Sequence, residues 1–237
     1  MQGAKRTFIA ACFAVLVSAC GGGKYSGAPS SANYDLQTGI ANMVTNGLSA
    51  NVALSGTVKV NGVSQAFTGS GTFTRAPGVS ATFNSTLASS QTTTVAGSIT
   101  VAGQSSPYST SVADYYASSD AALLGEVSGS EYDVAQAPIV FPTMIVGGSS
   151  GTLGTLSRYT NSTMSTSLGT AQVSYSVMAP VDPGSPIGVA LTTKIYDTQN
   201  TLIETDVTNY TMTSSDVISL SSGSAQTQSG MLTLTVQ

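Results

Sequence analysis

Eleven carboxylates and no histidine set the chemistry that this chain could perform. Glu131 and Asp133 are two residues apart, as are Glu204 and Asp206, and this spacing places each pair on one face of a β-strand. Paired carboxylates supply the acid and base of glycosidases, and carboxylate oxygens also bind calcium. A solvated strand face that discourages edge pairing explains the same pattern, and this is the arrangement that we expect for both pairs.

Residues 147–151 read GGSSG and match G-x-S-x-G, a pattern in which a serine nucleophile sits between a strand and a helix. Activation of Ser149 would need a neighbouring base, and the histidine that normally fills this role is absent. The residues that follow have the pattern of a strand and not of a helix. We therefore interpret the segment as a glycine-rich connection and predict that the protein is not an enzyme, with no catalytic residue.

Metal and cofactor sites lack their commonest ligands, because the chain has no histidine and its two cysteines, Cys12 and Cys20, both lie near the start. We expect no metal and no cofactor. Aromatic residues offer a different kind of site, a pocket for a sugar or a lipid. The candidates are Tyr115, Tyr116, Tyr175, Tyr196 and Tyr210. Tyrosines in strands more often form core and cross-strand contacts, which is the role that we expect for them.

The first twenty residues contain a secretion signal. Lys5 and Arg6 precede ten apolar residues, 8–17, as in the charged and apolar regions of a signal peptide. A helix of ten residues rises about 15 Å, whereas the bilayer core is about 30 Å thick, so this segment is too short to remain as a membrane span.

The end of that signal, Val17-Ser18-Ala19-Cys20, resembles the bacterial lipobox. The resemblance implies a lipoprotein signal peptide over residues 1–19, cleavage before Cys20, and attachment of diacylglycerol and an acyl chain to Cys20. An ordinary secretory signal cut after Ala19 also satisfies the small-x-small rule. We adopt the lipobox interpretation because the cysteine stands at the one position that a lipobox requires.

The lipid anchor bears on where the protein resides. Each buried CH₂ contributes about 0.8 kcal/mol, so two or three acyl chains hold a protein stably on a membrane. In lipoproteins that this signal resembles, Asp directly after the cysteine favours retention in the inner membrane. Gly21 occupies that position here. The resemblance therefore implies a bacterial cell envelope protein anchored in the outer membrane, on a face that the sequence does not specify.

The charge balance argues against nucleic acid as a partner. Two of the seven cations lie in the signal, so a chain starting at Cys20 carries five cations against eleven acids, a net charge of −6. Nucleic-acid binders need clustered cations to displace counterions from phosphates. Lys59, Arg75, Arg158 and Lys194 are scattered singly along the chain.

Behind the anchor, residues 20–32 are mostly Gly, Ser, Ala and Pro, a composition typical of a flexible tether. Residues 33–48 then place apolar side chains at helical spacing, with Asn33 as a candidate N-cap and Gly47 as the stop. From residue 49 the period changes to two, and turn signals such as Asn61-Gly62 separate about a dozen strands. The predicted class is all-β, an antiparallel meander with one short N-terminal helix.

A weak repeat divides the β region. Residues 110–115 (TSVADY) parallel residues 205–210 (TDVTNY), and residues 55–58 parallel 150–153, both at an offset of 95 residues. Chance similarity in a chain rich in Ser, Thr and Gly is the alternative. If the repeat is a duplication, residues 49–146 and 147–237 form two similar units that pack as a sandwich or as a curved half-barrel.

Residues 151–177 and 194–212 resemble a group of uncharacterised lipoproteins from β-proteobacteria. This resemblance covers mainly the C-terminal half, contains no catalytic motif and implies no site residue. Two functions of different classes follow from the sequence. The first is a non-catalytic, lipid-anchored envelope protein whose β domain is structural or binds an envelope partner. The second is a carrier that holds a lipid or another apolar ligand on a curved sheet, and a carboxylate-dependent glycosidase ranks third.

Overall fold

The computed structural model describes residues 33–129, 131–180, 182 and 184–237. The predicted signal peptide, Cys20 and the tether lie outside the described residues. The single helix described, α1, comprises Leu36–Asn46. The strands are β1 (Leu48–Val60), β2 (Val63–Arg75), β3 (Val79–Phe83), β4 (Thr86–Val101), β5 (Gln104–Ala117), β6 (Leu123–Ser128), β7 (Glu131–Ile139), β8 (Ser150–Tyr159), β9 (Ser167–Met178), β10 (Ile187–Tyr196), β11 (Leu202–Met212), β12 (Ile218–Thr227) and β13 (Gly230–Val236).

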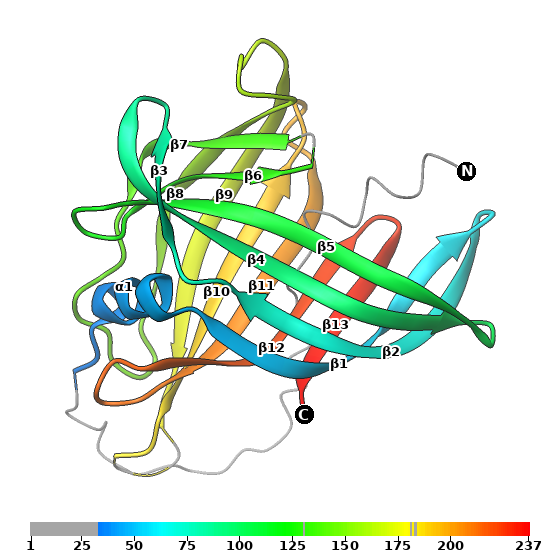
Figure 1. The fold of residues 1–237 in the computed structure, drawn as a ribbon, viewed down its shortest axis with the longest axis horizontal. Helices are drawn as coiled ribbons and strands as arrows, with labels where there is room; N and C mark the ends of the chain where they lie inside the picture. The colour runs from blue at the N-terminus through cyan, green and yellow to red at the C-terminus, as the bar shows by residue number, and fades with distance from the viewer. Residues whose placement is uncertain (1–32, 130, 181, 183) are drawn as a thin grey trace.

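The strands form one antiparallel sheet that closes on itself. From β4 to β13 each strand pairs with the next, β13 pairs with β1, and β1 pairs with β2. Pairing of β2 with β4 completes a barrel of twelve strands, and β3 is an extra strand that pairs with the start of β4. The barrel is visible in Figure 1, with α1 at one end and the β1–β2 hairpin at the other. The predicted all-β meander with one short helix is confirmed, but it forms a single closed sheet and not a two-sheet sandwich.

Close approach of two backbones allows the seam between β2 and β4 to form. Gly71 and Gly97 are directly opposite each other across this seam. A Cβ atom added to Gly97 would lie 2.5 Å from the Cα of Gly71, closer than real side chains come. Glycine at both positions therefore allows the last pair of strands to meet and the barrel to close.

Two turn signals read from the sequence are found in the structure. Asn61 and Gly62 join β1 to β2 in a two-residue loop, and both have positive φ, 52° and 81°. Positive φ at both positions matches the twist of a tight hairpin, which is why Asn-Gly is favoured there. Gly47, with φ of 70°, ends the helix as predicted, and its N–H bonds to the carbonyl of Met43.

The start of the helix differs from the prediction. The N-cap is Asp35 and not Asn33, because the Asp35 carboxylate accepts a hydrogen bond of 2.9 Å from the N–H of Thr38. Tyr34 is held in extended conformation before it by a β-bridge to Ile145, so the helix cannot begin earlier. An aspartate at this position satisfies an N–H that has no partner within the helix.

The helix seals one end of the barrel with apolar side chains. Leu36, Ile40 and Met43 are buried on its inner face and belong to the same core cluster as the strands. Within the described part of the chain, no helix has the length and apolar character needed to cross a lipid bilayer. The interior thus has an apolar end beneath α1, and the polar side chains described next lie further along the barrel.

Candidate functional site

A row of charged side chains crosses four neighbouring strands inside the barrel. Asp114 on β5 is paired in register with Glu126 on β6, Glu126 with Asp133 on β7, and Asp133 with Arg158 on β8. Directly paired residues in a sheet point to the same face. Asp114, Asp133 and Arg158 are buried, so the shared face is the inner one. We call these four residues the charged row.

Arg75 joins the charged row from the other side of the seam. Its guanidinium forms an ion pair with Asp114 and donates hydrogen bonds of 3.0 Å to the hydroxyls of Tyr116 and Tyr210. These partners come from β5 and β11, whereas Arg75 ends β2. One buried cation therefore connects three strands through their inward-facing side chains, and it compensates the charge of Asp114.

Arg158 holds the first of the two predicted carboxylate pairs. Its Nη2 lies 2.6 Å from Oε2 of Glu131, and its Nε lies 3.2 Å from Oδ2 of Asp133. The prediction of a solvated strand face is wrong for Asp133, which is only 8% exposed. Residues two apart on a strand share a face, so Glu131 and Asp133 both lie on the inner face of β7, which carries charged side chains in this part of the barrel. Glu131 lies nearer the hairpin and keeps 28% of its side chain exposed.

The second pair, Glu204 and Asp206 on β11, is also buried and does not form a solvated face. A side-chain hydrogen bond between the two carboxyls raises the pKa of Asp206 and lowers that of Glu204. Burial raises the pKa of Asp206 well above its usual range, and the charge of Glu204 raises it further. Burial also raises the pKa of Glu204, to about 7, although the bond from Asp206 opposes the shift. Two carboxyls can form such a bond only if one of them keeps its proton.

Two carboxyls of the charged row have pKa values raised to near neutral pH. Burial raises the pKa of Glu126 to about 8, and the negative charges of Asp114 and Asp133 add to the shift. Burial raises the pKa of Asp133 to about 7, with the Arg158 guanidinium acting in the opposite direction. The carboxyls of this region outnumber its guanidinium groups, so the interior is acidic and part of its negative charge is neutralised by protons.

A cavity of about 140 Å³ lies among these side chains. Its charged lining residues are Arg75, Asp114, Glu126, Glu131, Asp133 and Asp206. Apolar side chains, including Leu191, Ile195 and Val173, form another part of the wall. Among the residues that the structure describes, no group of three or more acidic residues has an arrangement that could hold a metal ion. The site is therefore an acidic pocket with one apolar side.

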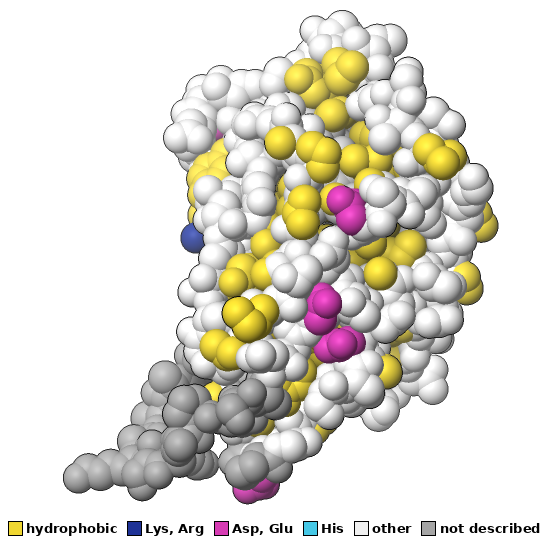
Figure 2. Space-filling model, turned by 90° about the vertical axis from the view of Figure 1, so that its left-hand side faces the viewer, with side chains coloured by type: hydrophobic (Ala, Val, Ile, Leu, Met, Phe, Trp, Pro, Cys, Tyr) yellow, Lys and Arg dark blue, Asp and Glu magenta, His cyan; other side chains and the backbone are white. Residues whose placement is uncertain are grey.

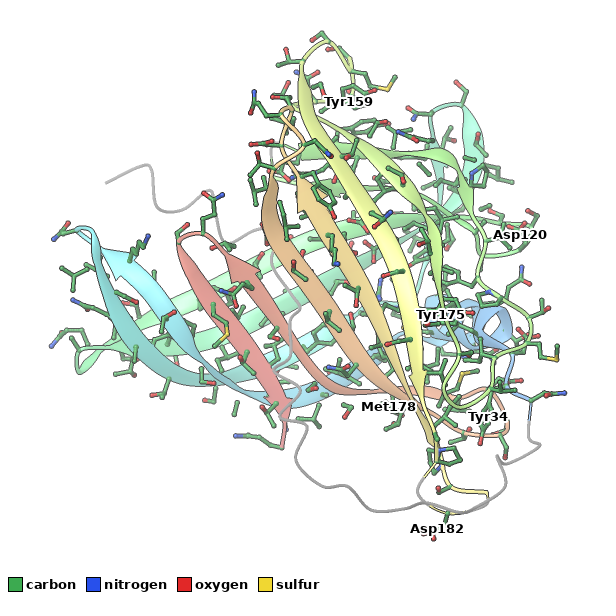
Figure 3. All side chains as sticks on the ribbon, turned by 180° about the vertical axis from the view of Figure 1, so that it is seen from behind. Tyr34, Asp120, Tyr159, Tyr175, Met178 and Asp182 are labelled. Carbon is green, nitrogen blue, oxygen red and sulfur yellow. The ribbon has the colours of Figure 1, made fainter. Side chains whose placement is uncertain are left out.

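The remaining candidates from the sequence lie elsewhere. Ser149 is half-buried in the connection between β7 and β8, where its hydroxyl donates a bond of 2.7 Å to the carbonyl of Val146. Of the five tyrosines, Tyr116 and Tyr210 line the cavity, whereas Tyr115 stacks on Phe83 with ring centroids 4.6 Å apart. Figure 3 shows Tyr159 at the opposite end of the barrel from Tyr34 and Met178.

Comparison with known proteins identifies no family for this chain. No protein family model matches the chain, and no curated protein matches it. A proposed outer membrane lipoprotein-sorting protein domain from Vibrio parahaemolyticus is similar in structure, with a TM-score of 0.29 and 11% sequence identity over 86% of this chain and 90% of that one. A DUF1329 family protein from Desulfovibrio piger has a TM-score of 0.27 and 9% identity over 89% of this chain and 92% of that one.

Replacement of Arg75 by methionine tests the pairing inside the barrel. We expect Arg75→Met to lower the free energy of unfolding by about 3–5 kcal/mol at neutral pH, because Asp114 is left buried without its cation. The double variant Arg75→Met/Asp114→Leu recovers much of this loss. Urea denaturation measures both, and Lys59→Met on the exposed surface serves as the control, with a change within about 0.5 kcal/mol. Additive losses in the double variant would contradict the pairing.

The raised carboxyl pKa values also predict an unusual dependence of stability on pH. Glu126 binds its proton more tightly in the folded chain, with a pKa of about 8 against 4.5 for an ordinary glutamate. The stabilisation is complete below pH 4.5 and is lost as the pH rises through the folded pKa, so stability falls from about pH 5 to pH 8. Denaturant midpoints across this range measure the slope, which Glu126→Gln reduces. A wild-type stability that rises over this range would refute the assignment.

Proposed function

We propose that the protein is a non-catalytic, lipid-anchored protein of the bacterial cell envelope, held in the outer membrane through Cys20, whose barrel binds a partner in the envelope. The lipobox at residues 17–20 and Gly21 support the anchor and the membrane. The observation that carries the proposal is that the barrel has an apolar core sealed by α1 at the end where the described chain begins, and that its interior leaves only a cavity of about 140 Å³. Contact with a partner is thus a task for the outer surface.

The end of the barrel at α1 carries exposed apolar side chains, which we call the α1-end patch. It consists of Val140, Met144, Val146, Met178 and Val217. The bridge between Tyr34 and Ile145 places the patch beside the start of the helix, as does the bond of 3.0 Å from the N–H of Asp35 to Asp216. Figure 2 shows this side of the molecule, where hydrophobic side chains are spread between a few acidic groups. We take these exposed apolar side chains as the candidate contact site.

The position of the α1-end patch relative to the anchor suggests an orientation. Twelve residues, 21–32, separate the lipidated cysteine from Asn33, and the chain between these two residues can span at most about 45 Å. The chain enters the fold beside the patch. The proposed anchor therefore keeps the α1 end towards the membrane and the β6–β7 hairpin, with Glu131, away from it.

The alternative of a lipid carrier has less support from the interior. Pockets for drug-sized ligands measure about 300–1,000 Å³ and are mostly apolar. The cavity at the charged row is about 140 Å³ and is lined by five carboxyls and one guanidinium. A long acyl chain would find too little room in it, and its charged wall would oppose an apolar ligand.

Lipidation is tested by replacing Cys20 with alanine. Wild-type protein expressed in a bacterium with a lipoprotein pathway should incorporate an alkyne-tagged fatty acid and sediment with outer membranes. Cys20→Ala should lose the label and either leave the membrane fraction or accumulate as uncleaved precursor. Cys12→Ala is the matched control, because Cys12 lies in the predicted signal and its replacement leaves labelling unchanged. Labelled, membrane-bound Cys20→Ala would show that the lipobox interpretation is wrong.

The orientation is tested with single cysteines at two exposed valines. Val217→Cys lies in the α1-end patch, and Val63→Cys lies in the β1–β2 hairpin at the other end of the barrel. In lipidated protein reconstituted into vesicles, a water-soluble maleimide should react more slowly at residue 217 than at residue 63. The same two variants of a chain that begins at Gly21, and so lacks both Cys12 and Cys20, should differ less. Equal rates in the vesicles would contradict the orientation.

A further inference from the structure

The cavity inside the barrel has an excess of negative charge that the protein does not fully pair. Five carboxyls and one guanidinium line it. Arg75 compensates Asp114, and Arg158 bonds to Glu131 and Asp133. These contacts leave Glu126, as well as the pair of Glu204 and Asp206, without a cation bonded to them among the described residues. A buried carboxylate needs a compensating positive charge or a proton.

Buried acceptor atoms at the cavity lack donors. Asp133 and Asp206 are 8% and 4% exposed, and both line the cavity. Among the described residues, Oδ1 of Asp133 and Oδ1 of Asp206 have no hydrogen-bond partner. Most buried polar atoms in proteins are paired, so unpaired oxygens on a cavity wall point to a ligand that donates hydrogen bonds.

The shape and lining of the cavity restrict the ligand. An apolar cavity of about 150 Å³ admits a molecule of the size of benzene, and this one is nearly as large. Leu191 and Ile195 supply an apolar surface beside the carboxyls. The acidic residues do not converge on a point where a metal ion would fit. A small molecule with one cationic end and one apolar end would match the acidic and the apolar parts of the cavity lining.

We propose that this cavity binds a small organic cation, an alkylammonium compound of a few carbon atoms. Its ammonium group has three N–H donors for the oxygens of Asp133 and Asp206, and its alkyl group lies against Leu191 and Ile195. Entry is beside Glu131, the most exposed of the carboxyls that Arg158 contacts. Bound there, the cation takes the place of the protons that otherwise neutralise the acidic wall.

The experiment uses the full-length mature protein in nonionic detergent and n-butylammonium chloride as the probe. Potassium chloride and potassium butyrate at equal concentration control for ionic strength and for the alkyl chain. We expect n-butylammonium alone to raise the Tm, by about 3 °C or more at ten times its Kd, because it binds the folded chain. An equal shift with potassium chloride, no shift, or a larger shift with calcium or magnesium would overturn the proposal.

Variants locate the binding. Asp206→Asn should weaken n-butylammonium about tenfold or more, because an amide cannot release a proton to become the anionic acceptor that the bound ammonium group needs. Ala171→Val narrows the cavity without changing its charge and should weaken the binding of n-butylammonium by a similar factor. This variant therefore tests the proposal if Asp206→Asn does not fold. Asp120→Asn, the same chemical change at an exposed turn, should leave the Kd unchanged. Binding that is unaffected by Asp206→Asn and Ala171→Val would show that the cation binds elsewhere and would overturn the proposal.

Discussion

The ion pair between Arg75 and Asp114 is the contact on which the polar half of this barrel depends. A guanidinium can be buried only where acceptors surround it, and here an aspartate and two tyrosine hydroxyls do so from β5 and β11. Arg75 ends β2, next to the seam at which the barrel closes. The same contact therefore compensates a buried charge and ties the closing strand to the far wall.

Closure of the sheet creates two interiors of different character. Beneath α1, Leu36, Ile40 and Met43 complete an apolar core with the strands around them, as in an ordinary folded domain. Further along, paired residues of β5 to β8 turn their charges inward, onto a cavity that they share with apolar side chains such as Leu191 and Ile195. A carboxyl row in this setting must be neutralised by arginine, by protons or by a ligand, because water cannot solvate it fully. Arginine provides the first through its ion pairs, the raised pKa values of Glu126 and Asp206 favour the second, and the third is the ligand that we propose.

The sequence was informative about local structure and uninformative about which face of each strand lies inside. Period-two patterns predicted the strands, Asn61-Gly62 the first hairpin and Gly47 the end of the helix, since each depends on a few adjacent residues. Ser and Thr occupy both faces of many strands here, so Glu131, Asp133, Glu204 and Asp206 gave no sign that they point inward. Arg75 and Tyr210 are 135 residues apart in the chain, and only closure of the barrel brings them together.

The predicted duplication stays a prediction. In the barrel, two tyrosines that it would make equivalent lie in different environments. At the offset of 95 residues, Tyr115 corresponds to Tyr210. Tyr115 stacks on Phe83 of β3, outside the central core, whereas Tyr210 points inward to Arg75. On β5 the inward position belongs to the next residue, Tyr116, which binds the same guanidinium.

Both strands have an irregularity at these tyrosines. The pairing of β5 with β6 shifts register between Tyr115 and Tyr116, and that of β11 with β12 shifts between Asn209 and Tyr210. A one-residue change at such an irregularity reverses the face of every side chain beyond it, so the strand pattern alone cannot show which tyrosine lies inside.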